Sequence, residues 1–308
     1  MKINRPLLMC LLFVSVWFSS EPVRAFCPVG YVSVVLTNGY NFFANPLDAT
    51  DPNGNFDNTL TNIIHSPPNG SRAYVWDVTN QVFLPRATYS NRWDLNYDLP
   101  PGKGFVVFVP SPCTNTIAGE VLCTSTNFVA GTNKFSLLGS IIPYTGQLTS
   151  PLGFPGTDGD QVYFFRSASQ SFSDAYTYHG GYGWFDPNGV DGTNGPIYNL
   201  AESFFVRNPG PNTNWVQMYP SGAAPSSLTV AASSTERKVS QIKISGGNVN
   251  LKLQDLGGGP YDVQFSTDGL TWITLARNQS GGTWTGKLPG AMRGYFQVVT
   301  SQTGRSAP

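Results

Sequence analysis

One short stretch of the sequence, DATDPNGNFDN at residues 48–58, is rich in oxygen-bearing side chains that suit a hard cation. The carboxylates and amides within it belong to Asp48, Asp51, Asn53, Asn55 and Asp57. Ca²⁺ takes such oxygens as its ligands in proteins. Counted from Asp51, the spacing departs from an EF-hand loop, because Gly54 stands fourth and Asn62 twelfth. Calcium is the one ion the sequence suggests, and a plain type I turn at Asp-Pro-Asn-Gly is the alternative.

A second stretch, AYTYHGGYGWFDPNG at residues 175–189, concentrates aromatic side chains beside glycines. Aromatic rings with a polar edge suit wet, half-apolar surfaces, where they can stack on sugar rings. Tyr178, Tyr182 and Trp184 are therefore predicted to bind a polysaccharide or a cell-surface glycan. The alternative is that Trp184 lies in the core, as we expect for Trp93 earlier in the chain.

Enzymatic chemistry has less support in the sequence. Glycoside hydrolysis needs two carboxylates that flank one bond, and the spacing of Glu120 and Glu202 selects no pair. His65 and His179 lie beside no Ser or Cys motif of the kind that nucleophilic catalysis uses. We predict no catalytic residue and a non-enzymatic protein, with a secreted carboxylate-dependent hydrolase acting on polysaccharide as the alternative.

Three cysteines follow the first 25 residues. In an oxidising compartment the simplest disulfide joins Cys113 to Cys123, which are close in the sequence. A bridge from Cys27 to either of them is left open. The spacing fits no zinc site.

Export is predicted because residues 1–25 have the pattern of a secretory signal peptide. Lys2 and Arg5 precede an apolar core at residues 7–18, and the small residue Ala25 ends the segment. The core is too short to span a membrane. The 15 basic and 17 acidic side chains after residue 25 give no general attraction to nucleic acid. We predict a secreted or cell-envelope protein without a transmembrane segment after signal removal and without a nucleic-acid partner.

The composition indicates short strands joined by many turns. Only 12% of the residues are charged, 13% are aromatic, and the chain has 33 Gly and 24 Pro. β-Branched and aromatic runs of four to six residues, such as YVSVVL and GFVVFV, are bounded by Asn, Gly, Pro and Asp. An all-β fold follows.

The sequence repeats itself between residues 35–110 and residues 133–211. The matching pairs are GYNFFANPL with KFSLLGSII, AYVWD with VYFFR, and DLPPGKGFVVFV with NLAESFFVRN. Tyr89 and Trp93 correspond loosely to Tyr176 and Trp184. Because the second copy lacks both glycines and the lysine of PGKG, that motif is a turn before a strand rather than a phosphate loop.

The last part of the chain is predicted to be a separate module. Residues 226–308 carry 8 basic and 4 acidic side chains, whereas residues 26–225 carry 7 and 13. The segment YDVQFSTDGLTWITL has Asp-Gly between two alternating strands, which is a hairpin signal. Ile273 and Leu275 are expected to face the same core as Tyr261, Val263 and Phe265.

The segments VGYVSVVLTNGYNFFANPL, AYVWD and LPPGKGFVV, together with YDVQFSTDGLTWITL, resemble a group of exported, uncharacterised bacterial β-repeat proteins. The resemblance covers most of residues 28–215 and, more weakly, residues 240–300. It implies a β-repeat fold and brings no activity or catalytic residues with it. The cysteines at positions 113 and 123 and the glycine-poor LAESFFV depart from the group's pattern.

These observations predict two tandem β-repeat units packed as a body, followed by a small immunoglobulin- or fibronectin-like β-sandwich. The predicted boundaries are signal peptide 1–25, unit 1 26–125, unit 2 126–220, linker 221–235 and sandwich 236–302. We predict a secreted interaction protein with a glycan-binding, adhesive or structural role. A third interpretation makes the C-terminal module an attachment or sorting domain.

Overall fold

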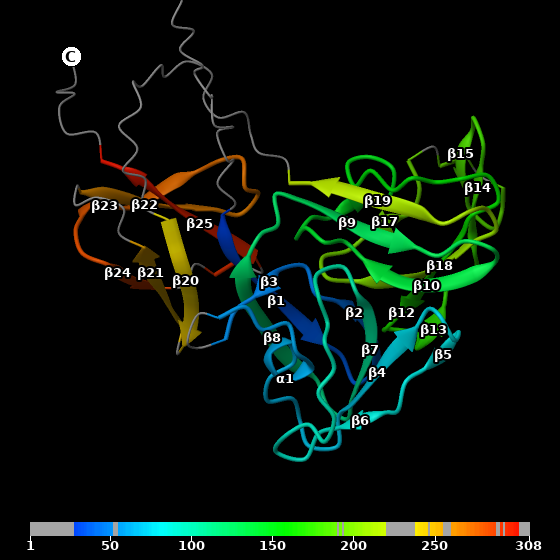
Figure 1. Ribbon diagram of the computed structural model, residues 1–308, viewed down its shortest axis with the longest axis horizontal. Helices are drawn as coiled ribbons and strands as arrows, with labels where there is room; N and C mark the ends of the chain where they lie inside the picture. The colour runs from blue at the N-terminus through cyan, green and yellow to red at the C-terminus, as the bar shows by residue number, and fades with distance from the viewer. Residues whose placement is uncertain are drawn as a thin grey trace, which may run out of the picture.

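The fold is all β, as the sequence predicts (Figure 1). The computed structural model describes residues 28–51, 55–189, 191–192, 194–219, 238–245, 247–254, 260–287, 290–291 and 293–301. In these residues the one helix is α1 (Leu60–Ile63), and no helix is long and apolar enough to cross a membrane. The predicted signal peptide and most of the predicted linker lie outside the described part of the chain.

The first unit is a sheet backed by a second pair of strands. The sheet runs in the order β2-β7-β4-β5, and β6 also pairs with β4. Its strands are β2 (Gly39–Ala44), β4 (Arg72–Asp77), β5 (Val82–Phe83), β6 (Ala87–Thr88) and β7 (Gly104–Val109). Behind it, β1 (Val29–Leu36) pairs with β8 (Cys113–Glu120), which also pairs with the short β3 (Asp48–Ala49). Buried Phe43, Val75 and Phe105 fill the space between the layers.

The second unit has the same plan. Its sheet runs β10-β18-β12-β14-β15-β16, with β13 also paired to β12. The strands are β10 (Lys134–Gly139), β12 (Gln161–Arg166), β13 (Ser171–Phe172), β14 (Tyr176–His179), β15 (Gly183–Phe185), β16 (Asp191–Gly192) and β18 (Ser203–Asn208). A two-stranded ribbon of β9 (Thr124–Val129) and β19 (Thr213–Met218) lies behind it, and β11 (Gly146–Gln147) pairs with β17 (Ile197–Tyr198). Buried Phe164, Phe204 and Trp215 form its core.

The two sheets also share their pairing register. Gly39 opposite Val109 in unit 1 corresponds to Lys134 opposite Asn208 in unit 2. The register refines the expected correspondence of the aromatic residues. Tyr176 is equivalent to Ala87, and the residue equivalent to Tyr89 is Tyr178, since both tyrosines bridge to a tryptophan.

The two units exchange equivalent contacts across their interface. The amide of Ala44 donates to the carbonyl of Ala201 at 2.9 Å, and the amide of Gly139 donates to the carbonyl of Gly102 at 2.9 Å. The two bonds are related by exchange of the units, because Gly139 stands where Ala44 does and Ala201 where Gly102 does. Each unit therefore meets the other through the same surface, as in a two-fold symmetric dimer.

Aromatic rings fill the space between the facing sheets. Phe42 of unit 1 stacks on Phe165 of unit 2 with ring centroids 4.6 Å apart. Phe205 of unit 2 meets Trp76 of unit 1 edge to face at 5.3 Å. Such pairs add stabilisation beyond the burial of their area.

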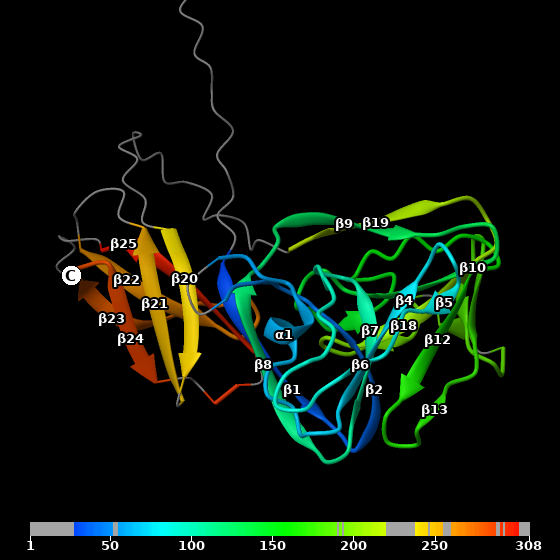
Figure 2. The same cartoon turned by 60° about the horizontal axis from the view of Figure 1, so that its bottom comes forward.

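The C-terminal part is joined to unit 1 through one continuous sheet. The strands are β20 (Lys238–Ser245), β21 (Asn248–Gln254), β22 (Tyr261–Ser266), β23 (Ile273–Gln279), β24 (Thr283–Lys287) and β25 (Arg293–Thr300). Because β25 pairs with β1, the six-stranded order is β23-β22-β25-β1-β8-β3. The sheet β20-β21-β24 packs against it over a third core that includes Val29 and Tyr31 of unit 1. The predicted module is thus not structurally separate, and Figures 1 and 2 show it at one end of the molecule.

The predicted hairpin is present, but the predicted burial of side chains on its second strand is wrong. β22 and β23 pair as expected, and the Asp268 carboxylate caps the turn by accepting from the amides of Leu270 and Thr271 at 2.8 and 2.7 Å. Ile273, predicted to face the core, is 56% exposed, and Leu275 is exposed too. The loop is longer than two residues and β23 lies at the sheet edge, so its residues are not covered on both faces.

Candidate functional site

A groove runs between unit 1 and the β9–β19 ribbon of unit 2. It consists of two adjoining cavities of about 500 and 610 Å³, which share Val78 and Phe128 as lining residues. The turn after β4 forms one wall and β9 the other. Sites for small ligands in proteins are typically concave spaces of this size with a few placed polar groups.

The inner cavity has an aromatic wall with fixed polar groups around it. The indole of Trp76 is held in place, because its Nε1 donates to the carbonyl of Phe135 at 2.9 Å. Asn127 Nδ2 donates to the carbonyls of Gly102 and Gly139 at 2.9 and 3.1 Å, which ties β9 to both units. Lys103 also lines this cavity and donates from Nζ to the carbonyl of Asp98 at 3.0 Å.

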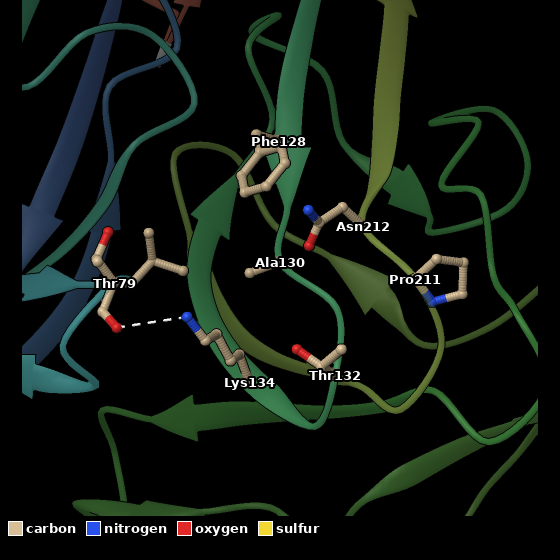
Figure 3. A pocket seen from close by; sticks show the side chains of 8 residues that line it. Thr79, Phe128, Ala130, Thr132, Lys134, Pro211 and Asn212 are labelled. Atoms are coloured by element: carbon tan, nitrogen blue, oxygen red, sulfur yellow. Dashed lines mark hydrogen bonds between the residues drawn. The ribbon is translucent and has the colours of Figure 1, made fainter.

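Figure 3 shows the outer cavity, where side chains from both units face one another. Lys134 extends from the start of β10 toward the carbonyl of Thr79, and its Nζ lies 3.4 Å from that oxygen. Thr132 and Asn212 add a hydroxyl and an amide on the other side, and Asn212 Oδ1 accepts from the amide of Gly131 at 2.8 Å. Hydroxyl, amide and ammonium groups therefore surround this part of the groove.

Phe128 connects the two cavities and is 49% exposed. Alternation along β9 explains its position. Val129 is buried, as is Trp215 of the paired strand β19, while Phe128 and Thr126 point outward. A half-exposed phenyl ring beside hydroxyls and amides is a suitable stacking surface for a sugar ring.

Asp48 is the only acidic residue among the described residues that line the groove. It lies directly opposite Glu120 across β3 and β8, where Cβ atoms are about 5 Å apart. Glu202 is held elsewhere, since its Oε1 lies 3.4 Å from Arg166 and Oε2 accepts from the amide of Asn199 at 3.0 Å. Burial raises the pKa of the Glu202 carboxyl. Glu120 and Glu202 therefore lie in different surroundings and form no pair.

The residues predicted to bind calcium are engaged in local hydrogen bonds. Asp48 Oδ1 accepts from Asn58 Nδ2 at 2.6 Å, Asp51 Oδ1 from the amide of Asn55 at 2.9 Å, and Asp57 Oδ1 from the amide of Thr59 at 3.0 Å. Asn53 lies outside the described part of the chain. No group of three acidic, His or Cys residues that could hold a metal occurs among the residues described. Calcium binding therefore stays a prediction.

The predicted aromatic site does not form a stacking platform. Trp184 is fully buried, and its Nε1 donates to Thr149 Oγ1 at 3.0 Å. Tyr178 packs edge to face on this indole, with centroids 5.2 Å apart, and is half-buried. Tyr182 alone of the three is open to solvent, at 71% exposure. Trp184 is a core residue like Trp93, and this corrects its predicted stacking role.

The predicted Cys113–Cys123 disulfide is wrong, because Cys113 is a free cysteine. Cys113 begins β8 and Cys123 follows its end, and an extended strand of eight residues spans about 27 Å. A disulfide needs Cα atoms within about 7 Å. Burial raises the pKa of the Cys113 thiol.

Sequence reasoning missed the residues that form the groove, above all Trp76 and Phe128. Both come from ordinary strand patterns, AYVWD and TSTNFV, which alternate without any binding motif. The only available signal was Phe128 itself, an apolar residue on the polar side of its strand. No protein-family model matches the chain, and no curated protein matches its sequence.

Proposed function

We propose that this chain is a secreted, non-enzymatic glycan-binding protein and that the groove holds a sugar chain. The half-exposed Phe128 ring, which lies between two cavities lined by hydroxyl and amide groups, supports this most directly. Sugar rings offer an apolar face for stacking and hydroxyls for hydrogen bonds, so they match both features. The signal-peptide pattern of residues 1–25 supports action outside the cytoplasm.

The lining residues also favour binding over hydrolysis. The described part of the groove contributes one carboxylate, Asp48, whereas glycoside hydrolysis uses two across the bond that breaks. Lys103 and Lys134 can donate hydrogen bonds to sugar hydroxyls from opposite ends of the groove. An adhesive or structural role at the cell envelope is compatible with the same binding.

The test is retention of the purified protein on cellulose, chitin, peptidoglycan, xylan and mannan, with reducing sugar assayed in the same tubes. Phe128→Ala should abolish retention on the polymer that binds. Phe172→Ala is the matched control, since Phe172 is 47% exposed and lies outside the groove. Circular dichroism checks that the variants are folded. Retention that survives Phe128→Ala, or that Tyr182→Ala abolishes instead, would place the site elsewhere.

One observation favours a hydrolase as the second candidate, namely the position of Asp48 opposite Glu120. Cβ atoms about 5 Å apart allow the two carboxyl groups to approach the separation that retaining glycosidases use. Release of sugar in the same tubes, lost in both Asp48→Asn and Glu120→Gln, would establish this activity and overturn the non-enzymatic proposal. No release from any bound polymer would dismiss it.

A further inference from the structure

The outer face of the sheet β20-β21-β24 carries lysines in a regular pattern. Ile242, Val249 and Leu251 of this sheet are buried in the third core. Alternation along each strand therefore directs the intervening residues outward. In Figure 2 the three strands lie at the end of the molecule away from unit 2.

The pairing register arranges these outward residues in rows across the sheet. One row contains Lys243, Asn250 and Thr285, and the next contains Gln241, Lys252 and Thr283. A third row pairs Asn248 with Lys287. Each row has one lysine, and the remaining positions named here are amides and hydroxyls.

The charged residues of these three strands are all lysines. The strands β20, β21 and β24 contain no Asp or Glu, and all four lysines that follow Lys134 in the sequence lie in them. Two of the four acids of residues 226–308 lie on other elements, where Asp262 Oδ1 accepts from the amide of Asn278 at 2.9 Å and Asp268 caps its turn. The other two, Glu236 and Asp255, lie outside the described residues. These three strands hold four of the eight basic residues of 226–308, whereas residues 26–225 are acidic.

The spacing suits several anions in succession rather than one. Neighbouring strands are about 4.8 Å apart and outward residues on one strand about 6.8 Å apart, so the Cα atoms of Lys243, Lys252 and Lys287 are separated by roughly 8 to 14 Å. A chain with a repeated negative charge can meet all three. The amides and hydroxyls between the lysines can bond its neutral groups.

We propose that this lysine face, formed by Lys243, Lys252 and Lys287, binds a linear anionic polysaccharide. It is a second surface, independent of the groove and of the proposed function. No large exposed apolar side chain occurs among the described residues of these three strands, so nothing on this face would insert into a bilayer. A polymer chain therefore fits it better than a lipid surface.

The test measures binding of the whole protein to polygalacturonate, with neutral dextran as the uncharged comparison. The triple variant Lys243→Gln, Lys252→Gln, Lys287→Gln should bind roughly tenfold more weakly, because three exposed charge pairs are lost. The control Arg86→Gln, Arg92→Gln, Arg277→Gln removes the same charge elsewhere and should stay within about twofold of the wild type. Binding should also fall in about 0.5 M salt, which screens exposed pairs.

Several results would overturn the proposal. Equal losses of polygalacturonate binding in both triple variants would show that only the net charge of the protein matters. Binding to vesicles with anionic phosphatidylglycerol, but not to polygalacturonate, would make the face a lipid contact. Binding to neither, with folded protein, would leave a plain solvated surface. Loss of polygalacturonate binding in Phe128→Ala would assign it to the groove, whereas loss of neutral-glycan binding in that variant bears only on the proposed function.

Discussion

Two equivalent glutamines join the units, and their replacement tests the two-fold arrangement. Gln81 Oε1 accepts from the amide of Phe135 at 2.8 Å, and its Nε2 donates to the carbonyl of Phe135 at 3.0 Å. Gln170 makes the same two bonds to Tyr40, at 2.7 and 3.0 Å. Each glutamine side chain thus hydrogen-bonds to the backbone of the other unit's edge strand, Gln81 to β10 and Gln170 to β2.

The two losses should differ because the bonds differ in exposure. Those of Gln81 are partly buried, so at about 0.5–1.5 kcal/mol for each hydrogen bond, Gln81→Ala should cost about 1–3 kcal/mol. Those of Gln170 are exposed, and water can replace them in Gln170→Ala. That variant should cost less than about 1 kcal/mol, because an exposed amide keeps its solvation.

The assay is urea unfolding followed by tryptophan fluorescence, in which a change of midpoint at constant slope reports stability. Gln81 has φ 58° and Gln170 has φ 53°, in the left-handed region. Gln81→Gly should therefore recover about 1 kcal/mol of the loss seen with Gln81→Ala, since glycine adopts this conformation without strain. Equal effects of the two alanine variants, or a larger effect of Gln170→Ala, would refute the reasoning.

Two further predictions concern a buried carboxyl and the cysteines. Burial raises the pKa of Asp160, so the native state holds this proton more tightly than the unfolded chain, and stability is lost as pH rises from about 4, the usual carboxyl pKa, through the raised value. Asp160→Ser, which copies the equivalent Ser71, should gain stability relative to the wild type between pH 4 and 7 in the same urea assay, and an unchanged difference would contradict this. The amide of Val121 donates to the carbonyl of Pro28 at 2.9 Å. Val121 is two residues before Cys123, and Pro28 directly follows Cys27 in the sequence. We therefore predict a Cys27–Cys123 disulfide, consistent with the bonded state of Cys123, and peptide mapping without reductant should find it; a map that joins Cys113 to either would oppose it.

The strand content could be predicted from the sequence because it depends on local patterns. AYVWD and VYFFR form β4 and β12, and equivalent residues occupy equivalent register positions. The joining of β25 to β1 could not be predicted, because nothing local specifies which edge pairs with which. The exposure of Ile273 follows from the same fact, since alternation alone does not say which strand lies at an edge.

The aromatic residues show why the site was harder to predict than the fold. An aromatic side chain in a glycine-rich segment can be either buried or in contact with a ligand. The sequence around Trp184 does not distinguish these two possibilities. Position in the assembled units does: Trp184 is fully buried, whereas Phe128, in an unremarkable strand, is left at the boundary between units. Inter-unit surfaces arise only when both units are placed, so their residues carry no local signal.

The two-fold arrangement also provides an internal comparison for the groove. At the equivalent place in the other unit, Val35 stands for Phe128, Glu202 for Lys103 and Gly39 for Lys134. Glu202 there is paired with Arg166, so an ion pair stands where the groove has the ammonium of Lys103. If the groove followed from the repeat alone, equivalent aromatic and basic residues would occur in both units. Since they occur in one unit only, the repeat does not account for Phe128 or Lys134, and the proposed glycan-binding groove would give both residues a role.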